Sequence, residues 1–237
     1  MGLEESVSGH LYGIGVGPGD PELMTLKAVR ILSEVPVVAY LAPDRGDSTA
    51  RAIAEKFIPA GREEIAIRVA MRPGPEPTDI YDRAAEEIAA RLTAGRDVAV
   101  LSEGDPFFYG SFAYLHDRLA PRFPCTIVPG VSSLTACAAA SGRALARRDE
   151  TLAILPATLS DAELARRLAS ADAAAILKVG RHLPRLTALL AQLGLIERST
   201  FVAHATRDDE KVAALADLGE TDAPYFSMIL IAKGPEQ

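Results

Sequence analysis

The sequence predicts an α/β fold with two domains, and three observations support this. Strand-like and helix-like segments alternate along most of the chain, as expected where helices cover parallel sheets. The strand-like residues 35–40 are apolar without alternation, which suits a strand buried on both faces. The chain has 237 residues, enough for two small domains, and its low aromatic content suits helices on sheets better than an aromatic-rich sandwich.

The first half of the chain reads as strands and helices in turn. Residues 11–16 are expected to form a strand, and a helix is expected to open at Asp20, which can cap it, with Pro21 in the first turn. Apolar residues at helical spacing continue this helix to residue 32. The further expected elements are strands at 35–40, 64–69 and 97–101, helices at 48–57, 79–92 and 111–119, and a proline-rich loop at 71–78.

The second half restarts the pattern after residues 120–124, which contain two prolines and are the candidate linker. We therefore expect domains of residues 1–123 and 124–237. The elements expected in the second are strands at 125–128, 151–155, 173–179, 200–204 and 226–232, and helices at 134–140, 161–169 and 183–193.

Composition narrows the class of protein. The formal net charge of −7 argues against a general nucleic-acid binder, although a local basic pocket is compatible with it. No apolar run long enough for a membrane span is visible, and the acidic N-terminus lacks a signal core, so we expect a cytoplasmic protein. Cys125 and Cys137 are expected to be buried, and neither they nor the four histidines have metal-site spacing, so no metal is expected.

Three glycine-containing turns each follow a predicted strand: residues 13–20, 103–106 (Glu-Gly-Asp-Pro) and 129–133 (Pro-Gly-Val-Ser-Ser). Ligands of open α/β sheets bind at the carboxyl ends of the strands. The first turn lacks the spacing of a dinucleotide fingerprint and the lysine of a Walker loop. Each turn could line a ligand site or could simply connect a strand to a helix.

These three segments, in this order and spacing, resemble the tetrapyrrole methylases of cobalamin and siroheme biosynthesis. The resemblance rests on residues 15–28, 104–106 and 129–133 and extends over nearly the whole chain, whereas no single segment is specific. Residues 10–24 and 103–111 are most similar to the branch that methylates C(20) of precorrin-2. Many sister enzymes have a glycine in place of Glu103.

The resemblance implies two α/β domains with a cofactor and substrate cleft between them, as in class III methyltransferases, and a homodimer. It implies S-adenosylmethionine as cofactor and S-adenosylhomocysteine as its product. Carried over by position, the cofactor residues are Glu103, Gly104, Asp105, Phe108, Ser132, Ser133, Val179 and Ala205. The glycine loop at Gly15, Gly17, Pro18 and Gly19 would face the tetrapyrrole, and Arg45, Arg72 and Arg147 would meet its carboxylates.

Methyl transfer from a sulfonium needs alignment more than a protein nucleophile, because the donor is already activated. A base could remove the proton from the methylated carbon, and Asp20, Asp44 and Asp105 are all candidates. Three alternatives remain: a sister enzyme acting at another carbon, the anaerobic-route enzyme acting on cobalt-factor II, and a binding module without catalysis. The basic residues near Arg147 could also be ordinary solvated surface.

Overall fold

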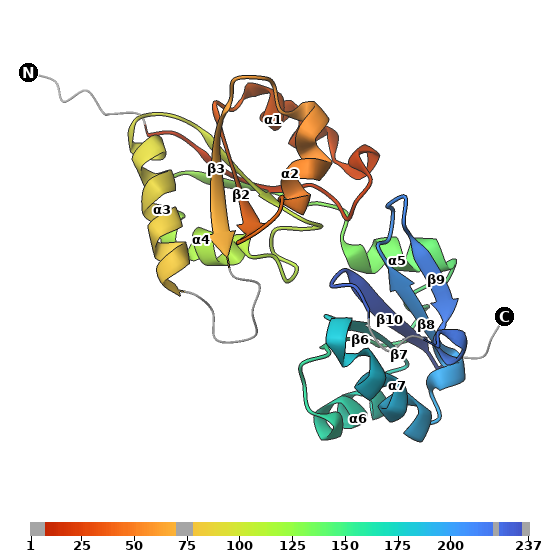
Figure 1. Cartoon of the computed structure of the whole chain (residues 1–237). Helices are drawn as coiled ribbons and strands as arrows, with labels where there is room; N and C mark the ends of the chain where they lie inside the picture. The colour runs from red at the N-terminus through yellow and green to blue at the C-terminus, as the bar shows by residue number, and fades with distance from the viewer. Residues whose placement is uncertain (1–7, 70–77, 220–222, 234–237) are drawn as a thin grey trace, which may run out of the picture. The chain divides into compact units, whose positions relative to one another are not determined.

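The computed structural model describes residues 8–69, 78–219 and 223–233 (Figure 1). The chain forms two compact units, Met1–Ser132 and Ser133–Gln237. Each described unit contains a five-stranded sheet with helices against it. The predicted fold class of two α/β domains is therefore confirmed.

The first unit is built on a fully parallel sheet with the strand order β3-β2-β4-β1-β5. Its strands are β1 (Leu11–Gly15), β2 (Val37–Pro43), β3 (Glu63–Val69), β4 (Val98–Ser102) and β5 (Cys125–Val128). All five residues of β4 are buried, as expected for a central strand of a sheet covered on both faces.

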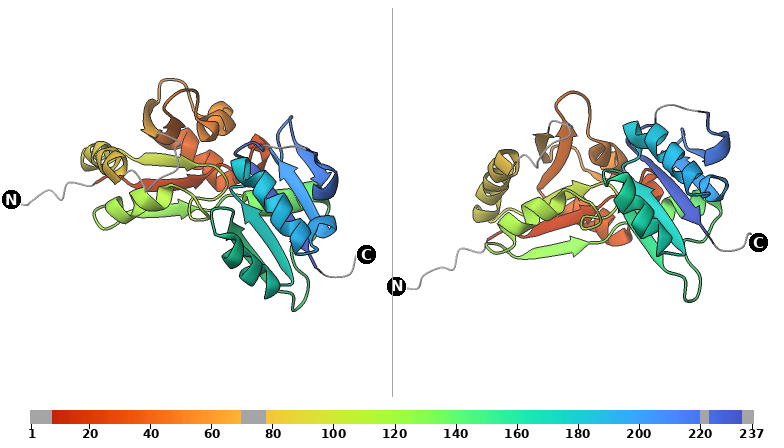
Figure 2. Two further views of the ribbon diagram at one scale, coloured as in Figure 1. Left: turned by 60° about the horizontal axis from the view of Figure 1, so that its bottom comes forward. Right: turned by 90° about the horizontal axis from the view of Figure 1, so that it is seen from below.

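Helices cover both faces of this sheet (Figure 2). They are α1 (Leu26–Glu34), α2 (Thr49–Ala54), α3 (Thr78–Thr93) and α4 (Phe112–Leu119), with the short 3₁₀ helices η1 (Pro21–Leu23) and η2 (Glu55–Phe57). One core holds apolar residues of α1 and α2, such as Ile31 and Ile53. The other holds residues of α3 and α4, such as Ile88 and Leu115. The unit thus has three layers, with the sheet in the middle.

Two sequence predictions are corrected in this unit. The helix expected from Asp20 to residue 32 is interrupted, because Met24 has extended backbone and Thr25 then caps α1. The strand expected to open the second domain, β5, pairs in parallel with β1, with Leu11 opposite Cys125. The boundary predicted at 123/124 therefore moves to 132/133, because residues 125–128 complete the first sheet.

The second unit has a mixed sheet with the order β6-β7-β10-β8-β9. Its strands are β6 (Leu152–Pro156), β7 (Ala173–Leu177), β8 (Ser199–Ala203), β9 (Lys211–Ala214) and β10 (Ser227–Ala232). β6 and β7 are parallel, whereas β10 runs antiparallel to both β7 and β8. The antiparallel β9 was not expected, because its four residues are mostly exposed and lack a buried apolar pattern.

The helices of the second unit are α5 (Ser133–Ser141), α6 (Asp161–Ala169) and α7 (Leu183–Gln192), with 3₁₀ helices η3 (Gly180–His182), η4 (Ile196–Arg198) and η5 (Leu215–Asp217). Leucines of α6 and α7, such as Leu164 and Leu186, pack on Ile176 and Phe201 of the sheet. α5 lies against β8 and β10. The predicted helix at 161–169 matches α6, which Ser160 caps through the N–H of Glu163.

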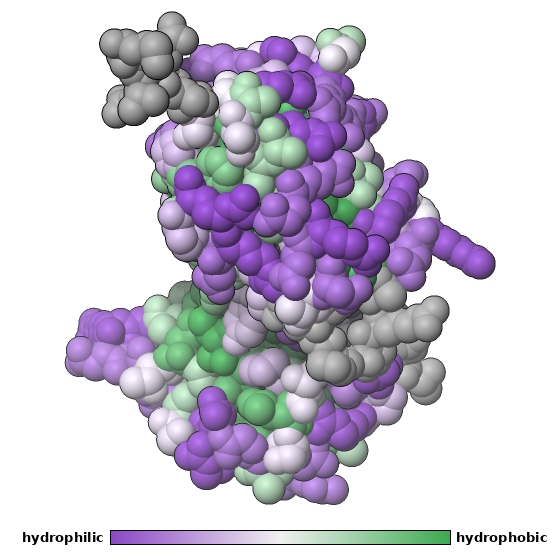
Figure 3. Space-filling view, turned by 90° about the vertical axis from the view of Figure 1, so that its left-hand side faces the viewer, coloured by the Kyte–Doolittle hydropathy of each residue, from purple (hydrophilic) through white to green (hydrophobic). Residues whose placement is uncertain are grey.

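The solvent side of the first unit is mainly hydrophilic where Figure 3 shows it. Ion pairs join α3 to α4, with Arg118 Nε 2.7 Å from Asp82 Oδ1 and Arg122 Nη1 2.6 Å from Glu86 Oε1. These exposed pairs contribute little to stability, about 0–1 kcal/mol each. Among the described residues, no helix has both the length and the apolar character needed to cross a membrane.

Candidate functional site

The first glycine loop and the Gly-Asp-Pro turn are joined at the carboxyl edge of the first sheet. β1 ends at Gly15 and β4 ends at Ser102, and the N–H of Val16 donates to the Ser102 carbonyl at 3.0 Å. Gly17 and Gly104 then form an antiparallel bridge, with N–H to carbonyl distances of 2.8 and 3.3 Å. Two segments nearly ninety positions apart in the chain thus form one backbone unit, as expected for strand ends in a parallel sheet.

The Pro-Gly turn meets the same two segments through its glycine. A Cβ on Gly15 would lie 2.5 Å from the Gly130 nitrogen and 2.7 Å from the Gly104 carbonyl oxygen. A Cβ on Gly130 would lie 2.0 Å from that same oxygen. Only glycine fits at both positions, because the atoms in the way belong to the backbone. The three segments singled out by the sequence therefore converge at one edge, within the first unit.

Asp105 holds this arrangement together. Its Oδ1 accepts the N–H of Phe107 at 2.9 Å, and its Oδ2 accepts the N–H of Gly130 at 3.1 Å. The carboxylate thus closes its own turn and attaches the Pro-Gly turn to it. Hydrogen bonds to an ionised acceptor are stronger than neutral ones. Asp105 was predicted as a cofactor residue and as a candidate base, and the observed contacts add a structural role that sequence reasoning missed.

Glu103 is held by the start of α2. Its Oε1 accepts the N–H of Ala50 at 3.2 Å, in the first turn of the helix, where a negative charge is favourable. Ser48 caps the same turn by accepting the N–H of Arg51. Glu103 is an exposed residue, so it lies at the surface of the edge.

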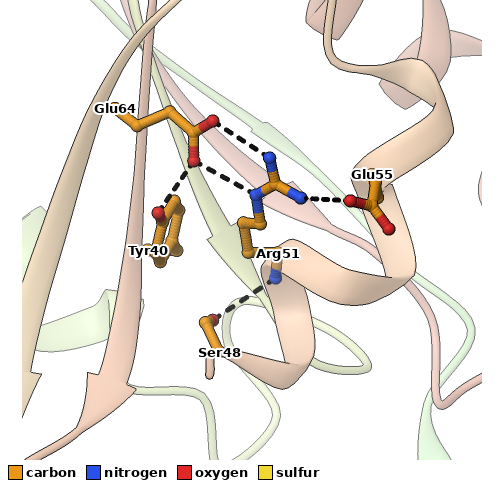
Figure 4. A network of polar contacts seen from close by, with 5 residues as sticks. All are labelled: Tyr40, Ser48, Arg51, Glu55 and Glu64. Carbon is orange, nitrogen blue, oxygen red and sulfur yellow. Dashed lines mark hydrogen bonds and ion pairs between the residues drawn. The ribbon is translucent and has the colours of Figure 1, made fainter. Parts of the chain in front are cut away.

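The helix that holds Glu103 is itself fixed to the sheet by a polar network (Figure 4). Arg51 donates to both oxygens of Glu64 on β3, at 3.1 and 3.2 Å, and to Glu55 at 2.8 Å. Tyr40 on β2 donates to Glu64 at 2.7 Å. The Arg51 hydrogen bond holds the pKa of Glu64 below its usual value, whereas burial and the bond to Glu64 raise the pKa of Tyr40. The network positions α2 and, through it, Glu103.

The other predicted residues of the first unit lie near this edge or outside the described residues. Asp20 accepts the N–H of Glu22 at 2.8 Å and caps η1, as predicted. Asp44 and Arg45 are exposed in the loop after β2. Because β2 runs parallel to its neighbour β4, this loop lies at the same edge of the sheet as the Gly-Asp-Pro turn. Pro18 and Gly19 are half-buried in the glycine loop. Arg72 lies outside the described residues.

Phe108 follows the Gly-Asp-Pro turn and is half-buried, with its ring edge-on to that of Tyr109 at 5.2 Å. Tyr109 has φ +56°, which is rare for a bulky residue. Gly110 next to it would place a Cβ 2.5 Å from the Pro106 carbonyl oxygen. Such strain persists only where surrounding structure enforces it, and it often marks a ligand site.

The second unit has a comparable concentration of strain at one edge of its sheet. β7 and β8 both run antiparallel to β10, so their carboxyl ends lie at the same edge. Positive φ values follow both strands, at Lys178 (+60°), His204 (+50°) and Thr206 (+71°). Val179 and Ala205, the predicted cofactor residues, are the buried neighbours of these positions. Sequence reasoning missed the strain, which depends on conformations that composition does not reveal.

Side-chain contacts at that edge fix the loop after β8. His204 Nδ1 lies 2.5 Å from Asp209 Oδ2, and the N–H of Thr206 donates to Glu210 at 2.6 Å. The Arg207 guanidinium lies over the ring of Phe226, 4.6 Å from its centroid. The sequence had not singled out Arg207, because its position depends on the pairing of β8 with β10.

The remaining predicted residues lie around α5. Ser133 is its first residue, and Ser132, the last residue of the first unit, precedes it; both are half-buried. Arg147 is exposed in the loop after α5, and its N–H donates to Glu150 at 2.7 Å. Arg143, by contrast, is anchored, because it donates to Thr200 of β8 at 3.0 Å.

The cysteines differ in burial. Cys137 is buried, as predicted, and burial raises the pKa of its thiol to about 12. Cys125 is only half-buried, which corrects the expectation that both are buried, and burial also raises the pKa of its thiol. Among the residues that the structure describes, no group of three or more His, Cys, Asp or Glu side chains could hold a metal ion.

Comparison with known proteins identifies relatives over most of the chain. The sequence profile of the Tetrapyrrole (Corrin/Porphyrin) Methylases matches residues 10–221. A Precorrin-2 C(20)-methyltransferase from a Sinorhizobium species is 41% identical over 94% of this chain and 95% of its own. A Cobalt-precorrin-2 C(20)-methyltransferase from Salmonella typhimurium is 32% identical over 96% of this chain and 98% of its own. The cobalamin biosynthesis protein CobIJ of Mycobacterium tuberculosis is 43% identical over 97% of this chain, which spans about half (47%) of that relative.

Solved structures with the same fold include two named methyltransferases. A cobalt precorrin-4 methyltransferase superimposes with a TM-score of 0.74 over 95% of this chain and 96% of its own, at 24% identity, which shows the fold alone. A uroporphyrin-III C-methyltransferase from Thermus thermophilus, complexed with S-adenosylhomocysteine, has a TM-score of 0.67 at 26% identity. It matches 95% of this chain and 92% of its own.

Proposed function

The chain belongs to the tetrapyrrole (corrin/porphyrin) methylase family, and we propose that it transfers a methyl group from S-adenosylmethionine to C(20) of precorrin-2. The product would be precorrin-3A, on the route to cobalamin. The observation that carries this proposal is the 41% identity to a precorrin-2 C(20)-methyltransferase, which extends over nearly the full length of both chains.

The described residues fit the cofactor in two respects. At the first sheet, the backbones of Gly15, Gly104 and Gly130 pack directly against one another, which fixes the Gly-Asp-Pro and Pro-Gly turns at the carboxyl edge, where ligands of such sheets bind. At the second sheet, Val179 and Ala205 lie next to residues with positive φ, and backbone strain of this kind is concentrated at ligand-binding and active sites. When bound, the cofactor supplies a methyl group already activated by its sulfonium.

We assign the cofactor to the residues predicted for it, which are Glu103, Gly104, Asp105, Phe108, Ser132, Ser133, Val179 and Ala205. Their role is binding and orientation, since a displacement of about 1 Å can cost about 100-fold in rate. Asp105 supports this role by fixing the two turns to each other. Glu103 supports it through the hydrogen bond that it accepts from Ala50 in the first turn of α2.

The chain must also accept the proton that the methylated carbon loses. Asp105 is the least suited of the three candidate bases, because both of its oxygens hold backbone N–H groups. Asp20 and Asp44 remain proposed bases at the same edge of the first sheet. We further propose that Gly15, Gly17, Pro18 and Gly19 face the tetrapyrrole and that Arg45, Arg72 and Arg147 meet its carboxylates.

The alternative acceptor is the cobalt-containing substrate of the anaerobic route. The greater identity to the metal-free enzyme, 41% against 32%, favours precorrin-2. Purified protein, supplied with precorrin-2 and methyl-labelled cofactor under anaerobic conditions, should give one product, with the label at the meso carbon C(20) by carbon NMR. A label at a pyrrole β-carbon would overturn the position. Turnover of cobalt-factor II but not of precorrin-2 would leave C(20) as the methylated carbon and assign the enzyme to the anaerobic route.

The same assay decides between an enzyme and a binding module, because a module would bind S-adenosylhomocysteine without turnover. The homodimer and the cytoplasmic location stay proposals. Light scattering should give twice the 25.1 kDa chain mass, and a monomer mass at every concentration would end the homodimer proposal.

A further inference from the structure

Arg207 is a half-buried arginine with an unmet hydrogen-bond donor. Among the described residues, its Nη2 is buried and has no hydrogen-bond partner. A buried donor left without a partner is costly, whereas a charged donor given a partner gains more than a neutral one. The guanidinium is nevertheless held in place, because it lies over the Phe226 ring at 4.6 Å.

Two nearby acids interact with other groups of the same loop. Asp209 pairs with His204 at 2.5 Å, and Glu210 accepts the N–H of Thr206 at 2.6 Å. Both acids lie within three positions of Arg207 in the chain, yet neither forms an ion pair with it among the described residues. Neither of these two acids therefore satisfies Arg207 Nη2.

Arg207 differs in its position from the second buried donor that lacks a hydrogen-bond partner among the described residues. That donor is Arg62 Nε, just before β3, at the amino ends of the first sheet's strands, where Arg62 Nη2 donates to the Ser33 carbonyl at 2.8 Å. Arg207 lies instead at the carboxyl edge of its sheet, in the loop that contains the two strained residues around Ala205. In open α/β sheets, the carboxyl ends of the strands are where ligands bind.

We propose that Arg207 binds a carboxylate of the ligand. Its planar guanidinium presents donors in a fork that matches a carboxylate, and stacking on Phe226 fixes the plane of that fork. The chemistry of the ligand rests on the proposed function, which supplies two sources of carboxylate. One is the methionyl carboxylate of the cofactor, and the other is a side-chain carboxylate of the tetrapyrrole.

The test uses three variants of the full chain. Arg207→Gln removes the charge and the fork, and Arg207→Lys keeps the charge alone. Arg166→Gln is the matched control, because Arg166 is an exposed arginine of α6 that is paired with Glu163. Calorimetry measures the affinity for S-adenosylhomocysteine and for 5′-methylthioadenosine, which lacks the amino-acid part. Kinetics with precorrin-2 gives KM, and thermal unfolding checks that each variant is folded.

If Arg207 binds the cofactor carboxylate, R207Q should lose about 10- to 100-fold in affinity for S-adenosylhomocysteine and keep its affinity for 5′-methylthioadenosine. If it binds the tetrapyrrole, the cofactor affinity stays and KM rises by a similar factor. R207K should fall between R207Q and the wild type in either case.

Unchanged cofactor affinity together with unchanged KM in R207Q would overturn the proposal, as would an equal loss for both nucleosides. A wild-type protein that binds S-adenosylhomocysteine but methylates no tetrapyrrole would overturn the proposed function instead. In that case, the affinities of R207Q for the two nucleosides would still test the role of Arg207. Unchanged affinity for both nucleosides would refute the proposal that Arg207 binds a carboxylate.

Discussion

Replacement of Gly15 by alanine should separate the segments that meet at the first sheet. The new Cβ would lie 2.5 and 2.6 Å from the nitrogen and Cα of Gly130, and 2.7 Å from the Gly104 carbonyl oxygen. Ordinary contacts begin at 3.4 Å, so these backbones must retreat by about 0.7–0.9 Å. No side chain can rotate away to relieve the clash, because every atom concerned is main chain.

The magnitude follows from two costs. Overpacking at a site that cannot repack costs about 1–3 kcal/mol, which corresponds to a fall in Tm of about 2–12 °C for a domain of this size. A displacement of nearly 1 Å at the cofactor site should also lower kcat/KM about 100-fold. Thermal unfolding and the methyl-transfer assay measure these two effects, and calorimetry with S-adenosylhomocysteine measures the affinity for the cofactor product.

Gly61→Ala is the matched control for this change. Gly61 has φ +82° with no atom within 4 Å of an added Cβ, and it lies before β3, away from the carboxyl edge. Alanine there should cost about 1–2 kcal/mol of stability and leave the activity unchanged. The reasoning would be refuted if Gly15→Ala bound the cofactor and turned over like the wild type.

Three further changes test other contacts. Asp105→Ala loses two hydrogen bonds to a charged acceptor, so the affinity for S-adenosylhomocysteine should fall by about 1–3 kcal/mol, and calorimetry with unchanged affinity would remove Asp105 from the site. Glu64→Gln should lower the free energy of unfolding by about 1 kcal/mol at pH 7. Because Arg51 lowers the folded pKa of Glu64, this contribution is full above the unfolded value of about 4.3 and is lost as pH falls through the folded value. Urea unfolding should thus show a smaller difference at pH 3 than at pH 7; equal differences would contradict the role of the charge. Cys137, with a thiol pKa of about 12, should react with iodoacetamide at pH 8 only after unfolding, and labelling in the native protein would show that it is accessible.

The convergence of the three glycine segments could be anticipated from the sequence because it follows from a general rule. Each segment follows a strand-like run, and parallel strands end at one edge of the sheet. The strand order was not predictable, and neither was the contact between Gly15 and Gly130. Such contacts depend on which strands become neighbours, here β4, β1 and β5.

The domain boundary was misplaced for a related reason. Residues 120–124 have the proline content of a linker, yet the Pro124 carbonyl accepts the N–H of Leu11 at 2.9 Å and leads directly into β5. Local composition cannot distinguish a linker from a loop that returns the chain to the sheet. Long-range pairing with β1 decides between them.

The second unit was harder to predict because its sheet is mixed. Alternating strands and helices favoured parallel pairing, whereas β10 inserts antiparallel between β7 and β8. This arrangement aligns the carboxyl ends of β7 and β8 and places Phe226 beneath Arg207. An isolated arginine in an acidic loop gave no sequence signal for such a contact.

The central claim is that the Gly-Asp-Pro and Pro-Gly segments at the carboxyl edge of the first sheet bind the cofactor. A crystal structure of the protein with S-adenosylhomocysteine tests it most directly. We predict ligand density within hydrogen-bond distance of the backbone at Gly104 and at residues 130–132. Well-defined density that contacts neither segment would contradict the account, even if the protein proved to be an active methyltransferase.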